Sequence, residues 1–424
     1  MGPLAVDEVA YDPREPAHVY AEGWQTWSPV APLRLGDESI RAASDRDQKV
    51  MFRPGKPVPP GVIQAEGLLV IAPDGGPARA WFAPDPARGV PTLWVEARGR
   101  RALVSADGPV ASLDADGIAE ALSAVGERLR PHRPPREIPT GWCSWSCYFK
   151  AVTEADVLEN VQAARHLDVP VEVIQLDDGY EAAIGDWLEP APRFGSLGRM
   201  AAGIRSAGMA AGIWIPPFMI DPRSELARDH ADWLVPELDA GEHWGVDMRI
   251  LDVTRPEAAA HLRRVFEGFV DSGFTFFKLD FLYAGALVSL DAYRAGMQLI
   301  RESVGDDAIL LIGGAPLLPS IGLCDAMRVG PDVLPETPDP QPDVETLKRI
   351  TLRRSWMNGR LWVNDPDHVV ARPEIEGRAE WARHVADYGG VRFSGDRLAS
   401  LDERGLELTR QVLSRRVSRA ARGA

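Results

Sequence analysis

Short apolar runs alternate with amphipathic stretches along the part of the chain that follows residue 140. Runs of four to eight apolar residues are typical of buried parallel strands, and the stretches between them, such as EADVLENVQAARHL and PEAAAHLRRVFEGFVDSG, have helical spacing. The strand candidates, in order, are GWCSWSCYF, VEVIQLDDGY, AGIWIPPF, FTFFKLDF, AILLIGGAP, DAMRVGPD, RLWVNDPD and VRFSGD. Eight repeated strand and helix units predict an α/β fold, a (β/α)8 barrel of the TIM type.

A different pattern precedes these units. VIQAEGLLVIAP and PTLWVEARG are β-like runs broken by Gly and Pro, which is typical of antiparallel strands. The Pro/Arg-rich stretch RPHRPPREIP, residues 130–139, separates the two patterns and is interpreted as a linker. We therefore expect a small antiparallel, β-sandwich-like domain over residues 1–130 and the barrel over residues 131–424.

Polar or aromatic residues end nearly every strand candidate. They are Asp177, Asp178, Trp214, Lys278, Asp280, Arg328, Asp332, Asn364 and Asp365. In a barrel these ends meet at one mouth, where active sites are built. A doubly wound open sheet also binds ligands at strand ends, but no Gly-rich nucleotide loop follows the first strand candidate, so the barrel is favoured.

Lys278 and Asp280 are two residues apart at the end of one strand candidate. Side chains on a strand alternate between faces, so the two point the same way, and the ammonium could keep the carboxylate ionised. The pair fits a glycosidase nucleophile, and equally a structural ion pair at a strand end.

Asp332 is the candidate partner of Asp280, since glycoside hydrolysis needs two carboxylates, one of them a proton donor. Gly330 and Pro331 turn the chain before it, and a simple turn-forming Asp is the alternative. A proton donor needs a raised pKa, which Arg328 would oppose. Our hypothesis is that Arg328 donates instead to a sugar hydroxyl on the far side of the pocket, which would reduce this conflict.

Asp177 and Asp178 are adjacent carboxylates that could accept hydrogen bonds from neighbouring sugar hydroxyls, or could hold a divalent metal. Lys278 would compete with a metal ion, and the eight His show no HxH or HExxH spacing, so we expect neither a metal nor another cofactor. Trp145 and Trp214, both expected on strands near the mouth, could stack on sugar rings or simply belong to the core.

Composition and charge limit the classes of molecule that the protein is expected to bind. The formal net charge of −15 argues against nucleic acid and anionic membranes and fits a small neutral substrate. No apolar run approaches the length of a membrane helix, and the first sixteen residues lack the apolar core of a signal peptide. Cys143 and Cys147 would lie about 13 Å apart along a strand, too far to bridge, and with Cys324 the count is odd. A soluble cytoplasmic protein is expected.

The stretches GWCSWSCYF, VIQLDDGY, GIWIPPF, FFKLDFLYAGA, APLLPSIGLCDAMRVGPDV and RLWVNDPD resemble the bacterial α-galactosidases of glycoside hydrolase family 36, the melibiase group. The likeness runs from about Gly141 to Asp367. It implies a retaining exo-glycosidase that hydrolyses terminal α-D-galactosides such as melibiose or raffinose.

The resemblance also implies roles for individual residues. Asp280 would be the nucleophile and Asp332 the acid/base. Asp177 and Asp178 would bind the hydroxyls at carbons four and six, Lys278 those at carbons three and four, and Arg328 the one at carbon two. The pocket would be lined by Trp145, Trp214 and, from the upstream motif EGWQTWSP, Trp27.

Several features depart from the family pattern. Ser146 stands where relatives often carry Tyr, and Gly313 where they often carry Cys, so both changes are expected to enlarge the site. The N-terminal domain looks trimmed and a C-terminal β domain absent, which leaves strand edges and favours a homo-oligomer. An α-N-acetylgalactosaminidase, a transglycosidase, a non-catalytic sugar-binding protein and a metal-dependent isomerase or lyase remain alternatives.

Overall fold

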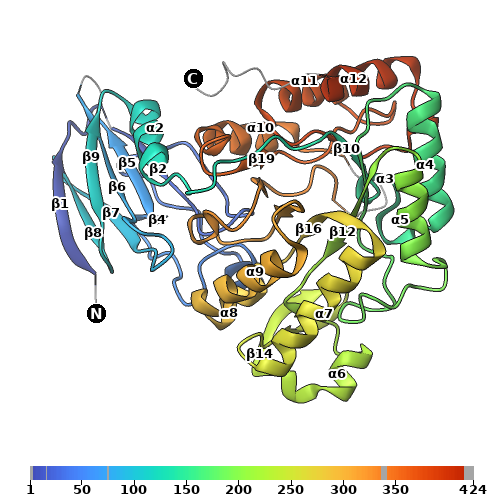
Figure 1. The fold of residues 1–424 in the computed structure, drawn as a ribbon. Helices are drawn as coiled ribbons and strands as arrows, with labels where there is room; N and C mark the ends of the chain where they lie inside the picture. Colours follow the sequence, from blue (N-terminus) through green and yellow to red (C-terminus); the bar gives the residue numbers. More distant parts are fainter. Residues whose placement is uncertain (1–2, 16, 74–75, 336–340, 415–424) are drawn as a thin grey trace. The chain divides into compact units, whose positions relative to one another are not determined.

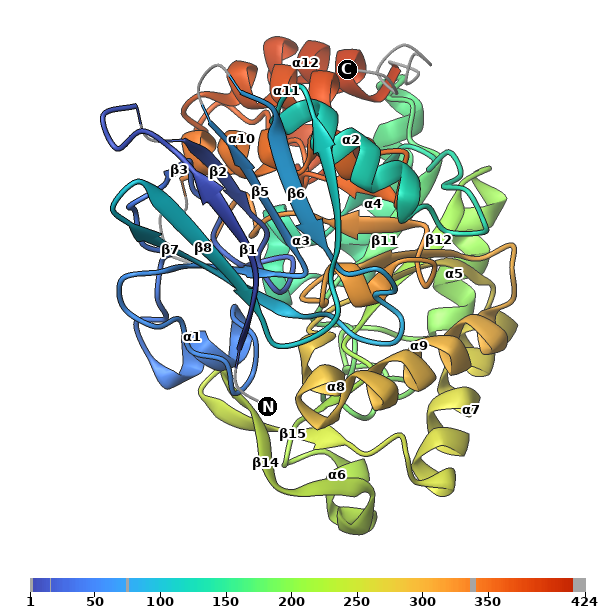
Figure 2. The same cartoon turned by 90° about the vertical axis from the view of Figure 1, so that its left-hand side faces the viewer.

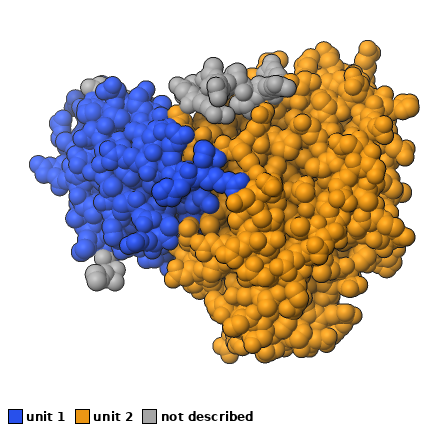
Figure 3. All heavy atoms as spheres, in the orientation of Figure 1, with its two compact units in different colours: residues 1–134, 316–322 blue, residues 135–315, 323–424 orange. Residues whose placement is uncertain are grey.

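A computed structural model of the protein describes residues 3–15, 17–73, 76–335 and 341–414. The chain forms two compact units, which Figure 3 shows in different colours. We call residues 1–134 with 316–322 the N-terminal β unit, and residues 135–315 with 323–424 the strand–helix unit.

Two antiparallel sheets make up the described part of the N-terminal β unit. One has the strand order β1 (Leu4–Ala10), β8 (Arg101–Ala106), β7 (Thr92–Arg98) and β4 (Ile63–Glu66). The other has the order β3 (Leu33–Arg34), β2 (His18–Ala21), β5 (Leu68–Ala72), β6 (Ala78–Phe82) and β9 (Ala111–Ala115). Two helices accompany them, α1 (Asp45–Val50) and α2 (Ile118–Arg128).

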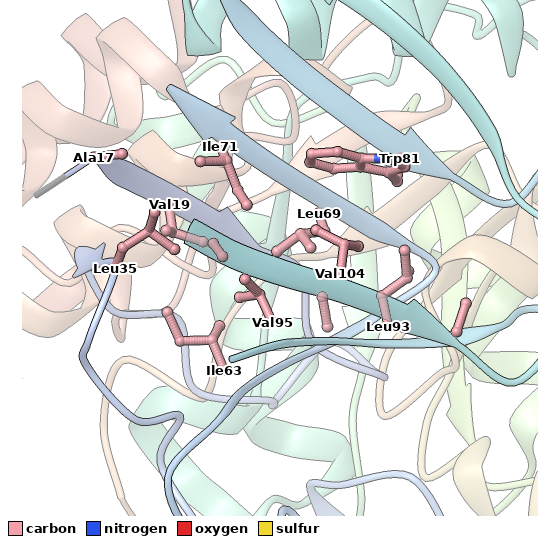
Figure 4. Close-up of a cluster of buried hydrophobic side chains, with 13 residues drawn as sticks. Ala17, Val19, Leu35, Ile63, Leu69, Ile71, Trp81, Leu93, Val95 and Val104 are labelled. Atoms are coloured by element: carbon pink, nitrogen blue, oxygen red, sulfur yellow. The ribbon is translucent and has the colours of Figure 1, made fainter. Parts of the chain in front are cut away.

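The two sheets share one hydrophobic core. Val104 and Val95 come from the first sheet, and Leu69, Ile71 and Trp81 come from the second; Figure 4 shows these side chains packed together. Along β8 buried and less buried residues alternate, as expected for a strand with one face on a core. The small antiparallel β domain expected from the sequence is therefore present.

Residues 316–322 belong to the N-terminal β unit although they lie far along the chain. The backbone N–H of Leu317 donates to the carbonyl oxygen of Trp24 over 2.9 Å, and Pro316 forms a β-bridge with Gln25. The hydrophobic pattern placed this segment in the barrel, because pattern reading assigns neighbours in sequence to one domain.

In the strand–helix unit, the described residues form one parallel sheet of eight strands, in the order β19-β18-β17-β16-β12-β11-β10-β20. The strands are β10 (Gly141–Cys143), β11 (Val173–Leu176), β12 (Ala210–Ile215), β16 (Phe274–Leu279), β17 (Ile309–Ile312), β18 (Ala326–Arg328), β19 (Val363–Asp365) and β20 (Phe393–Ser394). Each overlaps one of the eight strand candidates, and only β12 extends beyond its candidate, by one residue at its start. Backbone N–H groups of Gly390 and Val391 also donate to the carbonyl oxygen of Asn364, between the two ends of this order.

Helices lie around this sheet (Figure 1). They include α4 (Glu154–His166), α5 (Leu197–Ser206), α7 (Pro256–Ser272), α8 (Tyr283–Val288), α9 (Leu290–Val304), α10 (Val344–Arg353), α11 (Arg378–Tyr388) and α12 (Glu403–Ser414). A capping box at Thr153 and Asp156 starts α4, and α7 begins with Pro256 and ends at Gly273 in the left-handed conformation. These termini agree with the sequence pattern.

One strand prediction was wrong beyond its third residue. β10 ends at Cys143, and Trp145–Tyr148 form the short helix α3. The Oγ of Ser144 accepts the N–H of Asp177, and its carbonyl oxygen accepts the N–H of Tyr148, so the chain turns there. Trp145 and Cys147 are therefore helical, and the predicted spacing of Cys143 and Cys147 along a strand does not apply.

A hairpin that the pattern did not predict lies between β12 and β16. It pairs β14 (Leu234–His243) with β15 (Val246–Leu251), which also pairs with β13 (Met219–Ile220), and Figure 2 shows β14 and β15 beside α6 (Glu225–Asp229). Trp244 and Gly245 form its turn with φ of 52° and 74°. Two consecutive positive φ values are typical of a tight hairpin turn, which usually has Asn-Gly, Asp-Gly or Gly-Gly at these positions. Trp244 and Gly245 supply only one glycine, so the sequence signal for the turn is weak.

Candidate active site

The carboxyl ends of β11, β12, β16 and β18 bring polar side chains to one edge of the parallel sheet. Asp177 and Asp178 directly follow β11, while Lys278 lies in β16 and Asp280 follows it. Parallel strands place such ends side by side. The predicted residues of this unit are thus gathered by the strand order itself.

Lys278 binds Asp177, with 2.8 Å between Nζ and Oδ2 and both side chains buried. Gln175 Nε2 and the backbone N–H of Asp178 also donate to the Asp177 carboxylate. Burial alone would raise the pKa of Asp177, but Lys278 and these donors lower it overall. Burial opposes the charge of Lys278, yet Asp177 raises its pKa. The sequence paired this ammonium with Asp280; its hydrogen-bond partner is instead the carboxylate at the end of a different strand.

Two donors hold the Asp280 carboxylate. Trp214 Nε1 donates to Oδ2 over 3.1 Å, and the backbone N–H of Phe281 donates to Oδ1 over 2.9 Å. A Cβ at Gly313 would lie 2.9 Å from Asp280 Oδ1, closer than real Cβ contacts. The missing side chain at residue 313 therefore makes room for Asp280 itself.

Two side-chain donors, one from α3 and one from β18, likewise bind the Asp332 carboxylate. Trp145 Nε1 donates to Oδ2 over 3.1 Å, and Arg328 Nη1 donates to Oδ1 over 2.8 Å. The side chain is 41% exposed. Protein atoms crowding the carboxyl, and the negative charge of Asp367, raise the pKa of Asp332 to about 6 against the opposing effect of Arg328. Asp332 thus has the raised proton affinity expected of a proton donor.

Arg328 is buried among three carboxylates. Besides Asp332, its Nε donates to Asp365 Oδ2 over 3.0 Å, and its Nη2 lies 2.6 Å from Asp367 Oδ1. Burial disfavours the charged guanidinium, but these carboxylates raise its pKa. The expectation that Arg328 points away from Asp332 was wrong, because the strand order sets Arg328 of β18 beside the end of β19.

Asp367 and His368 extend this cluster and were not identified as site residues from the sequence. His368 Nδ1 lies 3.2 Å from Asp367 Oδ1 and 2.9 Å from Ser146 Oγ. Ser146 is buried and its hydroxyl contacts His368, so the small side chain at this position does not open space for a ligand. The only sequence signal was the polar end of RLWVNDPD, from which a pattern cannot choose the partner of each carboxylate.

Asp178 lies among charged and aromatic groups on the other side of Asp177. Its Oδ2 is 3.4 Å from Lys150 Nζ, and its side chain shares a hydrogen bond with the buried Glu181. Burial and Glu181 raise the pKa of Asp178, with Lys150 opposing. Lys150 Nζ also lies 3.6 Å from the ring centroid of Trp244, at the tip of the β14–β15 hairpin. The hairpin thereby contributes an aromatic face to this side of the site.

Part of the chain that carries these residues matches a known protein family. Residues 132–282 match the family model described as Melibiase. We call residues 132–282, which match this model, the melibiase domain. A structure of TtGalA, an α-galactosidase from Thermus thermophilus, in complex with stachyose is similar with a TM-score of 0.82 and 27% identity, covering 98% of this chain and 94% of that one.

The chain is also similar to "Alpha-galactosidase AgaA" from Geobacillus stearothermophilus, 25% identical over 135 residues, which is 30% of this chain and 18% of the relative. It is 31% identical over 112 residues to an Escherichia coli α-galactosidase, 24% of this chain and 16% of the relative. These matches span less than a fifth of the curated relatives' own length. The solved structure of AgaA, a glycoside hydrolase family 36 enzyme, has 16% identity and a TM-score of 0.69 over 96% of this chain and 62% of that one, and supports the fold.

Most of the predicted site residues fall inside the melibiase domain, which ends two residues after Asp280. Arg328 and Asp332 lie beyond it in the sequence and are joined to it in space, since Trp145 of the melibiase domain donates to Asp332. Trp27 belongs to the N-terminal β unit, where its backbone N–H donates to Gln25 Oε1 over 2.9 Å. Its predicted place in the pocket stays a prediction.

Outside and inside the melibiase domain, the described residues contain no cluster of three or more His, Cys, Asp or Glu side chains arranged to hold a metal ion. Within the same residues, none of the helices is both long and apolar enough to span a membrane.

Proposed function

We propose that the protein is a retaining exo-glycosidase that hydrolyses terminal α-D-galactosides of the melibiose or raffinose type. The observation that carries the proposal is the pair Asp280 and Asp332, two carboxylates from different strands at one sheet edge, each bound by an indole N–H. The melibiase match and the likeness to proteins named α-galactosidases support the sugar.

In the proposed first step, an Asp280 carboxylate oxygen attacks the anomeric carbon while Asp332 gives its proton to the departing glycosidic oxygen. The galactosyl group becomes an ester of Asp280. In the second step Asp332, now a carboxylate, takes a proton from water, and the water oxygen displaces Asp280 from the anomeric carbon. The raised pKa of Asp332 supports its part in both steps, since it must be protonated first and basic afterwards.

The remaining side chains are proposed to bind the sugar. Asp178 is buried and its Oδ2 has no hydrogen-bond donor among the described residues, although Lys150 lies near it, so it retains acceptor capacity for a hydroxyl. Asp177 and Lys278 would bind adjacent hydroxyls from their shared ion pair. Trp145 and Trp214 would line the pocket beside the carboxylates that they hold, and Arg328 would complete it.

We also infer that the eight-stranded sheet closes into a (β/α)8 barrel. The N–H groups of Gly390 and Val391, just before β20, donate to Asn364 in β19, and Val369 bridges Ser394 in β20. These bonds support closure between the two ends of the strand order. A domain boundary near residue 130 and a cytoplasmic homo-oligomer stay predictions from the sequence.

The test is turnover of an aryl α-galactoside and of melibiose. Asp280→Asn should lower kcat by about 10⁴-fold or more, as loss of a nucleophile does in other enzymes. Asp332→Ala should retain formation of the galactosyl ester from an aryl substrate with a good leaving group, and azide should restore turnover by giving α-galactosyl azide. Full activity of Asp280→Asn, or a β-galactosyl azide product from Asp332→Ala, would contradict the proposed roles.

A second sugar, N-acetylgalactosamine, was an alternative from the sequence because of Gly313. Gly313 has no side chain beside Asp280, and its Cβ position also lies 3.7 Å from Arg328 Cβ, on the side assigned to carbon two by resemblance. Asp280 Oδ1 lies 2.9 Å from the same Cβ position, so the carboxylate already occupies this space and the structure does not favour an acetamido group. The ratio of kcat/KM for aryl α-galactoside and aryl α-N-acetylgalactosaminide decides between the two sugars.

A further inference from the structure

Asp367 contacts both the side chain that binds Asp332 and the backbone beside Asp332. Its Oδ1 lies 2.6 Å from Nη2 of Arg328, whose Nη1 donates to Asp332. Its Oδ2 accepts the N–H of Val333, the residue that follows Asp332, over 2.5 Å. One buried carboxylate therefore restrains Asp332 in two ways, through the side chain of Arg328 and through the backbone at Val333.

The backbone of Asp367 is strained. Its φ is 88°, a backbone angle that residues other than glycine rarely adopt. Strain of this kind persists only where surrounding contacts fix it, and it concentrates at functional sites. Here the N–H of Asp367 donates to Asp365 Oδ1 over 2.9 Å, and the ring of His368 lies against Oδ1 of Asp367. The chain thus holds this carboxylate in place at a conformational cost.

We propose that Asp367 is a positioning residue for the acid/base Asp332, acting through Arg328 and the Val333 N–H. The inference rests on the proposed function, in which Asp332 is the proton donor. Asp367 itself is 1% exposed and is not assigned any contact with the substrate.

The charges that face Asp332 come from three elements. Arg328 at the end of β18 and Lys278 in β16 stabilise its carboxylate, while Asp280 after β16 and Asp367 after β19 stabilise its protonated form. Among these groups, the negative charge of Asp367 has the largest effect. His368 adds no opposing charge near neutral pH, because burial lowers its pKa.

Asp365 offers a matched control. It also pairs with Arg328 and is also buried, but it accepts from Nε, whereas Asp332 accepts from Nη1, and it does not accept the Val333 N–H. A carboxylate that merely neutralised Arg328 would be interchangeable with Asp365. A positioning residue would not be.

The experiment compares wild type, Asp367→Asn and Asp365→Asn on melibiose and on an aryl α-galactoside with a good leaving group. The wild-type kcat/KM should fall above about pH 6 as Asp332 loses its proton. Asp367→Asn should move this fall in kcat/KM, the alkaline limb of the pH profile, to a pH that is lower by about one unit or more. At pH 7 the kcat/KM for melibiose should therefore fall by a further factor of about 10. The aryl substrate, which needs less protonation, should lose much less, and Asp365→Asn should shift the limb less.

A folded Asp367→Asn variant with an unchanged limb, or with equal losses on both substrates, would overturn the inference while leaving the proposed function standing. Thermal unfolding of each variant separates loss of fold from loss of positioning. If Asp367→Asn does not fold, Asp367→Ser, which keeps an oxygen for the Val333 N–H, replaces it with the same readout. Absence of α-galactoside hydrolysis in wild type would overturn the proposed function and this inference with it.

Discussion

Lys278 Nζ lies 2.8 Å from Asp177 Oδ2, and this buried ion pair joins β16 to the residue that follows β11. Replacing Lys278 by Met should leave Asp177 buried without its cation. Breaking a buried pair by removing one partner costs about 3 to 5 kcal/mol, and the remaining donors to Asp177 favour the lower end, about 3 kcal/mol. Urea unfolding measures the loss. Lys348→Met, which removes a surface lysine from α10, is the matched control and should change stability little.

The stabilisation from this pair should depend on pH in a defined direction. The pKa of Asp177 is lowered in the folded state, so its contribution is present above the unfolded value of about 3.9 and disappears as the pH falls through the folded value. The pKa of Lys278 is raised, so its contribution is lost only at alkaline pH, above about 10.4. The stability difference between wild type and Lys278→Met should therefore be constant near neutrality and shrink in acid. A difference that grows below pH 4 would contradict the assignment.

Gly313→Ala should impair catalysis with little effect on folding. The added Cβ would meet Asp280 Oδ1 at 2.9 Å, and the carboxylate must move away. Displacing a reacting group by a fraction of an ångström to one ångström costs about 10- to 100-fold, so kcat/KM should fall by that factor. Gly203→Ala in α5 adds the same methyl group where its nearest neighbour is 3.7 Å away, and it should leave kcat/KM unchanged. Equal activity of Gly313→Ala and wild type would mean that the carboxylate is not confined there.

Trp244→Ala should weaken substrate binding more than it slows turnover. Its ring lies 3.6 Å from Lys150 Nζ, and Lys150 in turn lies beside Asp178. A cation over an aromatic ring is worth about 0.5 to 2 kcal/mol, so KM should rise about 2- to 30-fold as Lys150 becomes less ordered. Steady-state kinetics on melibiose tests this. If Lys150→Met gives the same rise and the double variant adds nothing, the two residues act as one unit; additive effects would refute that coupling.

The parallel strands were predictable because most of their side chains are apolar and buried. β16, FTFFKL, is buried at five of six positions, and its polar end follows at once in Asp280. The carboxyl ends of parallel strands lie at one edge, so the candidates Asp177, Lys278 and Asp280 could be gathered without knowing any contact. Arg328 and Asp332 followed from the same rule.

Local structure at Trp145 and at the β14–β15 hairpin was not predictable from the pattern. GWCSWSCYF has the composition of a strand, yet the Ser144 hydroxyl accepts the N–H of Asp177, which follows the neighbouring strand, and the chain turns into α3. The indole N–H of Trp145 reaches Asp332 from this helix. Only a contact between distant segments decides such a turn.

The sequence by itself determined which residues end the strands, because a two-residue alternation and an apolar run are local properties of the chain. It did not determine which charge pairs with which. Lys278 is two residues from Asp280 but binds Asp177, and Arg328 binds Asp365 and Asp367 as well as Asp332. Tertiary structure decided these partners, since the strand order sets the distances between side chains, and electrostatic attraction depends on distance in space and not along the chain.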